Sequence, residues 1–376
     1  MKRLICICLL LALLPLPVMA VEVPGKSAVL MDVATGRVLS AQNEHARLHP
    51  ASVTKVMTLL LIMEAIDGGT LGWQDTVTAS ANAAAKGGSQ IYLKENETMS
   101  VADMVKSIAV SSANDCACAM AEHLAGSEEA FVARMNERAA QLGMADTHFV
   151  NCTGLDDSPE ARDHLTSAYD IALMSRQLLK YHPDIKKYTM IWMDSVRNGE
   201  FGLSNTNKLV RFYNGATGLK TGFTAAAGYC LSASAERDGM ELVAVVMGCE
   251  TSQERFDACR KLLDHGFATY TLVQPKLDSA VEVPVVLGTE QTVAGELVGD
   301  SAMVIDKAHK SSLTIQLAME ASVKAPVSKG QRLGTLTARA GEQVLLQVPV
   351  VAAHAVPRLT YWQIFRLVLQ KLCTGQ

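Results

Sequence analysis

The stretch Pro50-Ala51-Ser52-Val53-Thr54-Lys55 decides the fold, because it begins a core-facing helix predicted over 51–66. Apolar residues recur through this segment at helical spacing, and Gly68-Gly69 ends it. Ser52 and Lys55 lie three positions apart at the start of the helix, so both side chains project from one face. A serine hydroxyl needs a base to become a nucleophile. A lysine serves as that base only if burial or a neighbouring positive charge lowers its pKa.

A Ser-x-x-Lys match alone is weak evidence, because about one or two are expected by chance in a chain of this length. On its own, Ser52 would be a helix cap and Lys55 a solvated surface residue. Two further motifs follow in a fixed order, Ser112-Ala113-Asn114 and Lys220-Thr221-Gly222. Another copy of the second motif, Ser80-Ala81-Asn82, is predicted to be an ordinary helix cap. The order and spacing of the three motifs indicate a serine acyl-transferase whose general base is a lysine.

The second motif supplies groups that can move a proton and hold an amide. The hydroxyl of Ser112 is expected to pass a proton between Lys55 and the leaving amine. The side-chain amide of Asn114 both donates and accepts hydrogen bonds, so it is expected to bridge Lys55 and a substrate amide. The alternative is a plain helix cap, since Ser-x-Asn is common there.

The third motif opens a predicted strand and supplies a positive charge. Lys220 is the predicted positive neighbour of Lys55. Together with the hydroxyl of Thr221, it suits the terminal carboxylate of a substrate. Gly222 is expected to let a substrate backbone approach the strand closely. The alternative interpretation of this motif is a plain edge strand.

Strand patterns lie at both ends of a predicted catalytic domain, residues 21–271, with helices between them. Residues 27–42 predict a β-hairpin that turns at Ala34-Thr35-Gly36. Further strands are predicted over 218–223, 228–235 and 240–247, and further helices over 101–123 in two pieces, 128–142 and 255–263. This order favours an α+β fold, in which helices cover an antiparallel sheet.

The composition changes from about residue 272. Short β-branched segments punctuated by Gly and Pro predict a small all-β domain over 272–355. After Pro357, apolar residues, Tyr361 and Trp362 among them, fall on one helical arc of the segment 356–376. We interpret this segment as an amphipathic helix that anchors the chain at a membrane surface. The alternative is a helix docked on the β domain.

Residues 1–20 have the features of a secretory signal peptide. Lys2 and Arg3 precede an apolar stretch over 4–16, and Val18-Met19-Ala20 resembles a cleavage site. The chain is therefore expected to be exported, to the outer face of a bacterial cytoplasmic membrane or the cell-wall space. Its net charge of −4 and evenly spread basic residues give no reason to expect nucleic acid as a partner.

Seven cysteines remain after residue 20, and their odd number and irregular spacing do not form a disulfide framework. Cys116-Ala117-Cys118 lacks the spacer of common zinc sites and no His cluster joins it, so no metal or other cofactor is expected. Most of these cysteines are predicted to be buried small apolar residues.

The three motifs and several other segments resemble the D-alanyl-D-alanine carboxypeptidases, low-molecular-mass penicillin-binding proteins of the serine peptidase type. The resemblance extends to the predicted β domain and terminal helix, and therefore covers nearly the whole chain after residue 20. The additional segments are 30–39 in the first hairpin, Asn151-Cys152-Thr153-Gly154-Leu155, Leu165-Thr166-Ser167-Ala168-Tyr169-Asp170, Arg255-Phe256 and Lys261-Leu262-Leu263.

The resemblance implies a role for each motif residue. Ser52 is the acylated nucleophile and Lys55 its base, while Ser112 and Asn114 assist proton transfer and substrate placement. Lys220, Thr221 and Arg255 hold the substrate's terminal carboxylate. The oxyanion hole is formed by the backbone N–H groups of Ser52 and Phe223. Phe223 stands where a histidine or threonine is common, but only its backbone is needed.

The implied reaction removes the terminal D-alanine from a peptidoglycan stem peptide that ends in D-Ala-D-Ala. Ser52 attacks the amide, D-alanine leaves, and the acyl-enzyme is hydrolysed. Penicillins and other β-lactams are expected to acylate the same serine, as covalent inhibitors.

Two alternatives share these motifs. A class A-like β-lactamase would need a Glu for its deacylating water, and the candidate Glu160 has His164 where an Asn is usual. That enzyme would also need neither the β domain nor the terminal helix. A non-catalytic wall-binding scaffold of the same fold has no reason to retain the three motifs intact.

Overall fold

The computed structural model describes residues 21–277, 281–299 and 301–374. The chain divides into two compact units, one ending at Gly266 and the other beginning at Phe267. The predicted signal peptide, residues 1–20, lies outside the described residues. The predicted domain boundary after residue 271 falls within a strand of the second unit, Tyr270–Val273.

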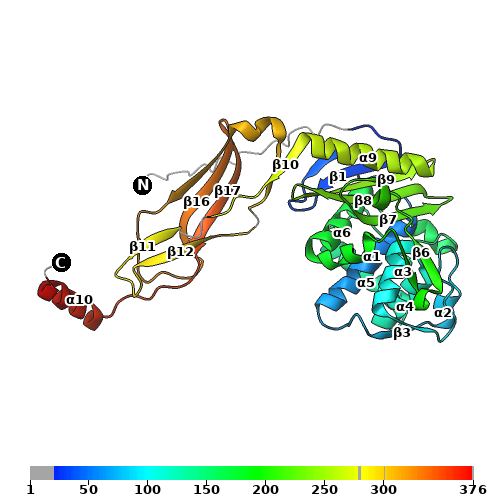
Figure 1. The fold of residues 1–376 in the computed structure, drawn as a ribbon, viewed down its shortest axis with the longest axis horizontal. Helices are drawn as coiled ribbons and strands as arrows, with labels where there is room; N and C mark the ends of the chain where they lie inside the picture. The colour runs from blue at the N-terminus through cyan, green and yellow to red at the C-terminus, as the bar shows by residue number, and fades with distance from the viewer. Residues whose placement is uncertain (1–20, 278–280, 300, 375–376) are drawn as a thin grey trace, which may run out of the picture. The chain divides into compact units, whose positions relative to one another are not determined.

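The first unit is built on an antiparallel sheet of five strands in the order β2-β1-β9-β8-β7. Figure 1 shows α9 (Ser252–Thr269) on one face of this sheet and α6 (Ala168–Tyr181) with the other helices on the opposite face. The predicted α+β arrangement is confirmed, with α9 longer than predicted. The strands are β1 (Ser27–Asp32), β2 (Val38–Gln42), β7 (Ala216–Thr224), β8 (Gly228–Arg237) and β9 (Met240–Cys249).

The helical layer packs around α1 (Lys55–Asp67), which is buried along most of its length and ends at Gly68. The four residues before it, Ala51–Thr54, form a 3-10 helix, so the predicted start of the α-helix at residue 51 lies four residues too early. The other long helices are α3 (Val101–Ser111), α4 (Asn114–Ala125) and α5 (Glu128–Gln141), close to the predicted ranges.

Short elements complete the first unit. Ser80 caps α2, because its hydroxyl accepts a 3.0 Å hydrogen bond from the Ala83 N–H, as its sequence context predicted. The short helices are α2 (Ala81–Ala84), α7 (Lys186–Thr189), α8 (Leu209–Phe212) and the 3-10 helices Pro159–Asp163, Pro183–Ile185 and Arg197–Gly199. The short strand pairs are β3 (Thr76–Thr78) with β4 (Thr98–Ser100) and β5 (Met193–Val196) with β6 (Phe201–Ser204).

The second unit consists of β-strands followed by one helix. Its main sheet has the order β14-β16-β17-β12-β11-β15, and β10 pairs with β13. The strands are β10 (Tyr270–Val273), β11 (Glu282–Val286), β12 (Thr292–Leu297), β13 (Met303–Asp306), β14 (Leu313–Met319), β15 (Val323–Lys324), β16 (Arg332–Ala340) and β17 (Gln343–Ala352), with a 3-10 helix over Lys307–Ser312.

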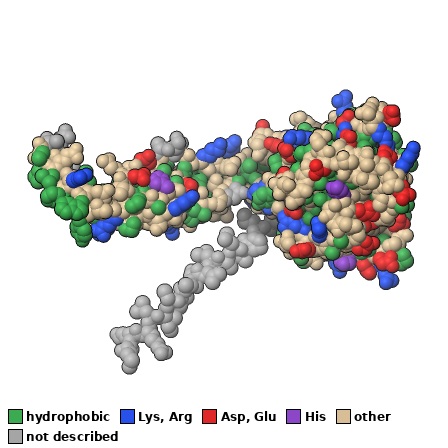
Figure 2. All heavy atoms as spheres, turned by 90° about the horizontal axis from the view of Figure 1, so that it is seen from below, with side chains coloured by type: hydrophobic (Ala, Val, Ile, Leu, Met, Phe, Trp, Pro, Cys, Tyr) green, Lys and Arg blue, Asp and Glu red, His purple; other side chains and the backbone are tan. Residues whose placement is uncertain are grey.

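The last helix, α10 (Tyr361–Thr374), exposes its apolar side chains. Trp362 and Leu372 are each 77% exposed, and Figure 2 shows hydrophobic side chains gathered over this helix. Among the described helices, none has the length and apolarity needed to cross a membrane.

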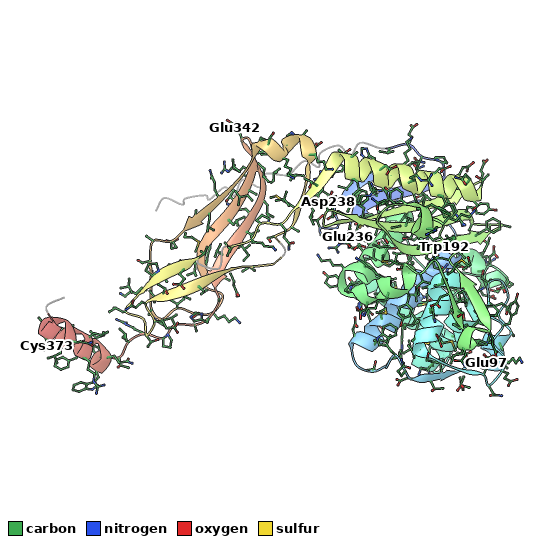
Figure 3. All side chains as sticks on the ribbon, in the orientation of Figure 1. Glu97, Trp192, Glu236, Asp238, Glu342 and Cys373 are labelled. Atoms are coloured by element: carbon green, nitrogen blue, oxygen red, sulfur yellow. The ribbon has the colours of Figure 1, made fainter. Side chains whose placement is uncertain are left out.

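Six of the seven described cysteines are buried, as predicted, and Cys373 on α10 is exposed (Figure 3). All seven are free thiols. Within the described ranges, no group of three or more His, Cys, Asp or Glu side chains is arranged to hold a metal ion.

Candidate active site

Ser52 and Lys55 contact each other through their polar side-chain atoms, next to the edge strand β7 of the five-stranded sheet. The Nζ of Lys55 lies 2.8 Å from the Oγ of Ser52 and donates a 2.8 Å hydrogen bond to the carbonyl oxygen of Thr153. The Lys55 side chain is fully buried. Burial lowers its pKa to about 7, against the opposing effect of the charges at Cys152 and Asp115. A lysine with that pKa is present as the free amine in a large fraction of molecules near neutral pH.

Lys220 does not lower the pKa of Lys55 in the way that the sequence suggested. Burial accounts for the low pKa of Lys55. The pKa of Lys220 itself falls well below its ordinary value, first through burial and then through repulsion from Lys55 and Arg255. Lys220 is 1% exposed, and its Nζ donates a 3.0 Å hydrogen bond to the carbonyl of Thr221. An arriving anion would restore the positive charge of this lysine.

The second motif lies where α3 ends and α4 begins. Ser112 ends α3 with a left-handed backbone, φ +64°, and Asn114 begins α4. Both side chains are buried, yet the Ser112 Oγ and the Asn114 Oδ1 have no hydrogen-bond partner in the described part of the chain. Buried polar atoms without partners are rare in folded proteins. These two atoms are therefore suited to receive a ligand.

The predicted contact between Asn114 and Lys55 is wrong for this structure. The amide nitrogen of Asn114 instead donates a 2.7 Å hydrogen bond to the carbonyl of Gly87. The sequence analysis did not predict the acceptor of the Lys55 hydrogen bond, which is the Thr153 carbonyl. The remaining free atom of the Asn114 amide is its oxygen, an acceptor for a substrate N–H.

The third motif lies on β7, the edge strand of the sheet. A Cβ at Gly222 would stand 2.6 Å from the Pro50 carbonyl oxygen and 3.1 Å from the Ser52 nitrogen. The close approach that requires this glycine is therefore made by the chain's own nucleophile segment, whereas the sequence suggested a substrate backbone. Thr221 donates a 2.7 Å hydrogen bond to the hydroxyl of Thr206, a contact that no sequence motif indicated. The 54% exposed Phe223 stacks on Tyr229 at 4.2 Å.

Arg255 reaches β7 from α9. Its guanidinium donates a 2.9 Å hydrogen bond to the Gly222 carbonyl and lies over the rings of Tyr229 and Phe256. Burial lowers its pKa, and within the described residues its Nε has no hydrogen-bond partner. Lys55, Lys220 and Arg255 form no ion pair with any acid in the described part of the chain. Lys220 and Arg255 are therefore suited to bind an anion, whose negative charge would favour the protonated form of Lys220.

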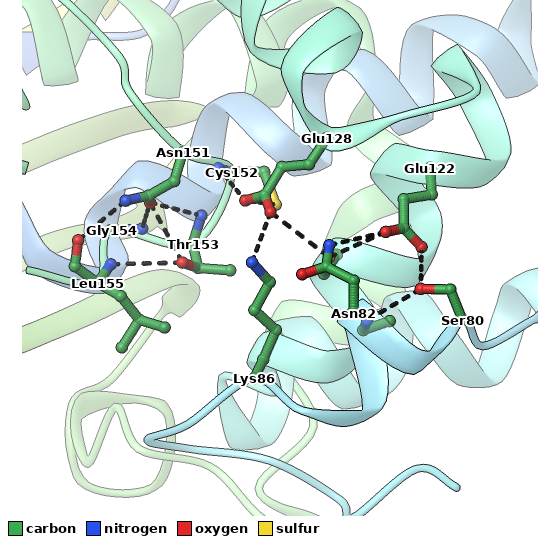
Figure 4. A network of polar contacts seen from close by, with 12 residues as sticks. Ser80, Asn82, Lys86, Glu122, Glu128, Asn151, Cys152, Thr153, Gly154 and Leu155 are labelled. Carbon is green, nitrogen blue, oxygen red and sulfur yellow. Dashed lines mark hydrogen bonds and ion pairs between the residues drawn. The ribbon is translucent and has the colours of Figure 1, made fainter. Parts of the chain in front are cut away.

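The loop that carries Thr153 is held in place by side chains on both sides (Figure 4). The side-chain oxygen of Asn151 accepts hydrogen bonds from the backbone N–H groups of Thr153 and Gly154. Glu128 accepts hydrogen bonds from the Cys152 N–H, at 3.3 Å, and from Lys86, at 2.6 Å. This network fixes the backbone so that the Thr153 carbonyl reaches Lys55. The segment 151–155 stood out in the sequence as family-like, but its side chains gave no sign of this role.

The Glu candidate of the β-lactamase alternative is a surface residue. Glu160 lies in the short helix Pro159–Asp163 and is fully exposed. The nearby buried position belongs to His164, whose Nε2 lies 2.8 Å from the Thr54 hydroxyl. Glu160 therefore makes no contact with Ser52 or Lys55 in the described part of the chain.

The fold and the contact of the buried Lys55 with Ser52 define a serine hydrolase of the penicillin-binding type. Residues 16–251 match the D-alanyl-D-alanine carboxypeptidase family, and residues 267–358 match the C-terminal domain of penicillin-binding protein 5. D-alanyl-D-alanine carboxypeptidase DacF of Bacillus subtilis is 41% identical over 334 residues, which cover 87% of this chain and 85% of that protein.

Solved structures agree with this assignment. Penicillin-binding protein 5 from Haemophilus influenzae superposes with a TM-score of 0.78 at 29% identity, covering 91% of this chain and all of that one. Penicillin-binding protein D2 from Listeria monocytogenes, in its ampicillin-bound form, superposes with a TM-score of 0.60 at 31% identity, over 66% of this chain and 99% of that one.

The chain belongs to the D-alanyl-D-alanine carboxypeptidase family. The predicted fold, family and serine hydrolase activity are confirmed. The family match also includes the β domain, which a β-lactamase does not need.

Proposed function

We propose that Ser52 and Lys55 carry out the two chemical steps of D-alanine release from peptidoglycan stem peptides. Lys55 takes the hydroxyl proton as the Ser52 oxygen attacks the carbonyl carbon of the D-Ala–D-Ala amide. The C–N bond then breaks, and D-alanine leaves with a proton on its amine. Water attacks the remaining ester in the second step and regenerates the serine. The observation that carries this proposal is the 2.8 Å contact of a fully buried lysine, with its pKa near 7, to the Ser52 hydroxyl.

The terminal carboxylate of the substrate is assigned to the buried cations beside β7. Lys220 and Arg255 are buried without an acidic partner among the described residues, and Thr221 adds a hydroxyl on the same strand. A carboxylate bound there would pair with the Arg255 guanidinium and would favour the protonated form of Lys220. This explains why the enzyme would act on the end of a peptide.

The oxyanion hole is assigned to the backbone N–H groups of Ser52 and Phe223. This assignment is supported by the close approach of the nucleophile segment to β7, where a Cβ at Gly222 would lie 3.1 Å from the Ser52 nitrogen. Ser112 is assigned the transfer of a proton to the leaving amine, and the free oxygen of Asn114 the binding of a substrate amide.

The proposal extends to β-lactams, because the Listeria relative has been solved with ampicillin bound. A β-lactam presents a strained amide, which Ser52 can attack, and a carboxylate, which Lys220 and Arg255 can bind. We expect ring opening by Ser52 and a persistent ester.

We also propose that the chain is exported and held at a membrane surface by α10. Residues 1–20 have the pattern of a secretory signal peptide. The helix α10 exposes Trp362, Phe365 and Leu372, and it is too short to span a bilayer. A chain truncated after residue 355 should lose binding to anionic phospholipid vesicles in a flotation assay while it retains D-alanine release. Equal binding by both chains would exclude this anchor.

The catalytic proposal is tested by D-alanine release from diacetyl-Lys-D-Ala-D-Ala. The wild-type chain should release D-alanine, and Ser52→Ala should release none. Mass spectrometry after penicillin treatment should find the adduct on the peptide that contains Ser52. An adduct on any other residue, or D-alanine release by the variant, would contradict the assignment.

A further inference from the structure

A buried histidine outside the three motifs contacts the nucleophile segment. The Nδ1 of His164 accepts a 3.0 Å hydrogen bond from the Val150 N–H, and its Nε2 lies 2.8 Å from the Oγ1 of Thr54. Because Nδ1 acts as an acceptor, the ring proton of the neutral imidazole is on Nε2. His164 therefore donates to Thr54, the residue directly before Lys55.

Thr54 passes this interaction on to the backbone before the nucleophile. Its hydroxyl donates a 2.8 Å hydrogen bond to the carbonyl oxygen of Ala51. Ala51 has φ +47°, a left-handed conformation that costs free energy for a residue with a side chain. Gly154, labelled in Figure 4, packs so close that a Cβ there would lie 1.9 Å from the same oxygen. The Ala51 carbonyl is thus held by contacts in an orientation that the local sequence does not favour.

The Ala51 carbonyl and the Ser52 N–H belong to one planar trans peptide group and point in opposite directions. Fixing the carbonyl therefore fixes the direction of the N–H. A hydrogen bond to the carbonyl also polarises the amide and makes its N–H a stronger donor. The hydrogen bonds from His164 to Thr54 and from Thr54 to the Ala51 carbonyl thus act on both the direction and the donor strength of the Ser52 N–H.

We propose that His164 is a positioning residue, which acts through the Thr54 hydroxyl to direct the Ser52 N–H at the oxyanion of the tetrahedral intermediate. This inference rests on the proposed function, because it requires the Ser52 N–H to be part of the oxyanion hole.

The ring of His164 stays neutral, so the direction of these hydrogen bonds is constant. Burial lowers the pKa of His164 to about 3, and electrostatic interactions with His49, His148 and Lys55 add to the effect. Phe149 packs edge-on against the imidazole with ring centres 5.7 Å apart, which further fixes its plane. Protonation of Nδ1 would place its N–H opposite the N–H of Val150, and the hydrogen bond between these two groups would be lost.

A matched pair of substitutions separates positioning from simple anchoring. In His164→Asn, the side-chain oxygen can replace Nδ1 and keep the Val150 contact, but the amide is too short to reach Thr54. In His164→Gln, the longer amide can replace Nε2 and donate to Thr54. We expect kcat and the rate of Ser52 acylation by penicillin to fall by about 10- to 100-fold in the Asn variant. Both should stay within about threefold of wild type in the Gln variant, and KM should change little in either.

Thr54 provides the second comparison. Thr54→Val keeps the shape and removes the hydroxyl, so it should reduce kcat by about 10- to 100-fold with little change in KM. Thr54→Ser keeps the hydroxyl and should retain most of the wild-type kcat. The midpoint of the pH profile should stay near 7 in the active variants, because Lys55 remains the base.

The outcomes distinguish this inference from the function on which it rests. Wild-type kcat in Thr54→Val would overturn the positioning role, whatever the His164 variants do. Equal losses in Thr54→Val and Thr54→Ser, with lowered melting temperatures in both, would also overturn it, because packing alone would then explain them. Failure of penicillin to label Ser52 in the wild-type chain would instead refute the proposed function.

Discussion

The tripeptide Ser-Ala-Asn occurs twice in this chain, and its two copies differ in what their polar atoms contact. In the first copy, Ser80 caps α2 and donates a 2.6 Å hydrogen bond to Glu122, and the Asn82 amide donates to the same carboxylate at 2.8 Å (Figure 4). In the second copy, Ser112 Oγ and Asn114 Oδ1 are buried and lack partners among the described residues. Identical residues therefore stabilise a helix in one place and leave two buried polar atoms without hydrogen-bond partners in the other.

The lysines near the segment 151–155 show the same contrast. Lys86 pairs with Glu128 at 2.6 Å, and hydrogen bonding to that carboxylate raises its pKa even though burial opposes the shift. Lys55 has no acidic partner in the described residues, and burial lowers its pKa to about 7. The two lysines therefore differ in their partners, since Lys86 is paired with a carboxylate and Lys55 contacts only a hydroxyl and a carbonyl among the described residues.

Substitution of the two lysines by methionine should show the largest contrast. Lys55→Met should lower the rate of acylation by penicillin by about 10³-fold or more, because among the described residues only Lys55 brings a basic side chain into contact with the Ser52 hydroxyl. Its melting temperature should change little, because the cost of burying the amine is removed together with its hydrogen bond to the Thr153 carbonyl. Lys86→Met should lose less than about tenfold in rate but should melt at a lower temperature, because Glu128 would lose its partner. Stopped-flow acylation and calorimetry measure both effects, and similar rates in the two variants would remove the contrast.

Substitution of the two serines tests the tripeptides directly. Ser112→Ala should reduce D-alanine release by about 10²-fold, while its melting temperature should stay the same or rise. Ser80→Ala should leave the turnover unchanged and lower the stability by about 1 kcal/mol, through loss of the helix cap. Turnover on diacetyl-Lys-D-Ala-D-Ala and denaturant unfolding provide the two readouts. If Ser112→Ala keeps its turnover, the two copies are functionally alike.

The pH dependence of acylation should follow the pKa of Lys55. The free amine is the active form, so the rate should rise about tenfold per pH unit below 7 and level off above it. Burial causes this low pKa, so a substitution that admits water to the lysine should move the midpoint upward. The check is the acylation rate of the wild-type chain between pH 5 and 9. A midpoint near 10 would mean that Lys55 behaves as a solvated lysine.

The sequence was sufficient for the fold class and the motif residues because these depend on periodicity and on residue type. It was not sufficient for contacts made by the backbone or between distant segments. The Thr153 carbonyl that receives the Lys55 hydrogen bond has no residue-type signature. The contact between Thr54 and His164 spans 110 positions. The need for Gly222 was predicted, but the neighbour that requires it, the nucleophile segment, became visible only in the fold.

Phe223 provides the smallest expected effect, because its backbone and its side chain are assigned separate roles. The side chain is 54% exposed and stacks on Tyr229, while the backbone N–H is assigned to the oxyanion hole. Phe223→Ala should therefore change kcat/KM by less than about threefold. Loss of the stacked ring pair should lower the stability by about 1 kcal/mol. A loss of kcat/KM of tenfold or more with unchanged stability would show that the ring itself contacts the substrate. The binding site would then include the Phe223 side chain as well as the backbone of β7.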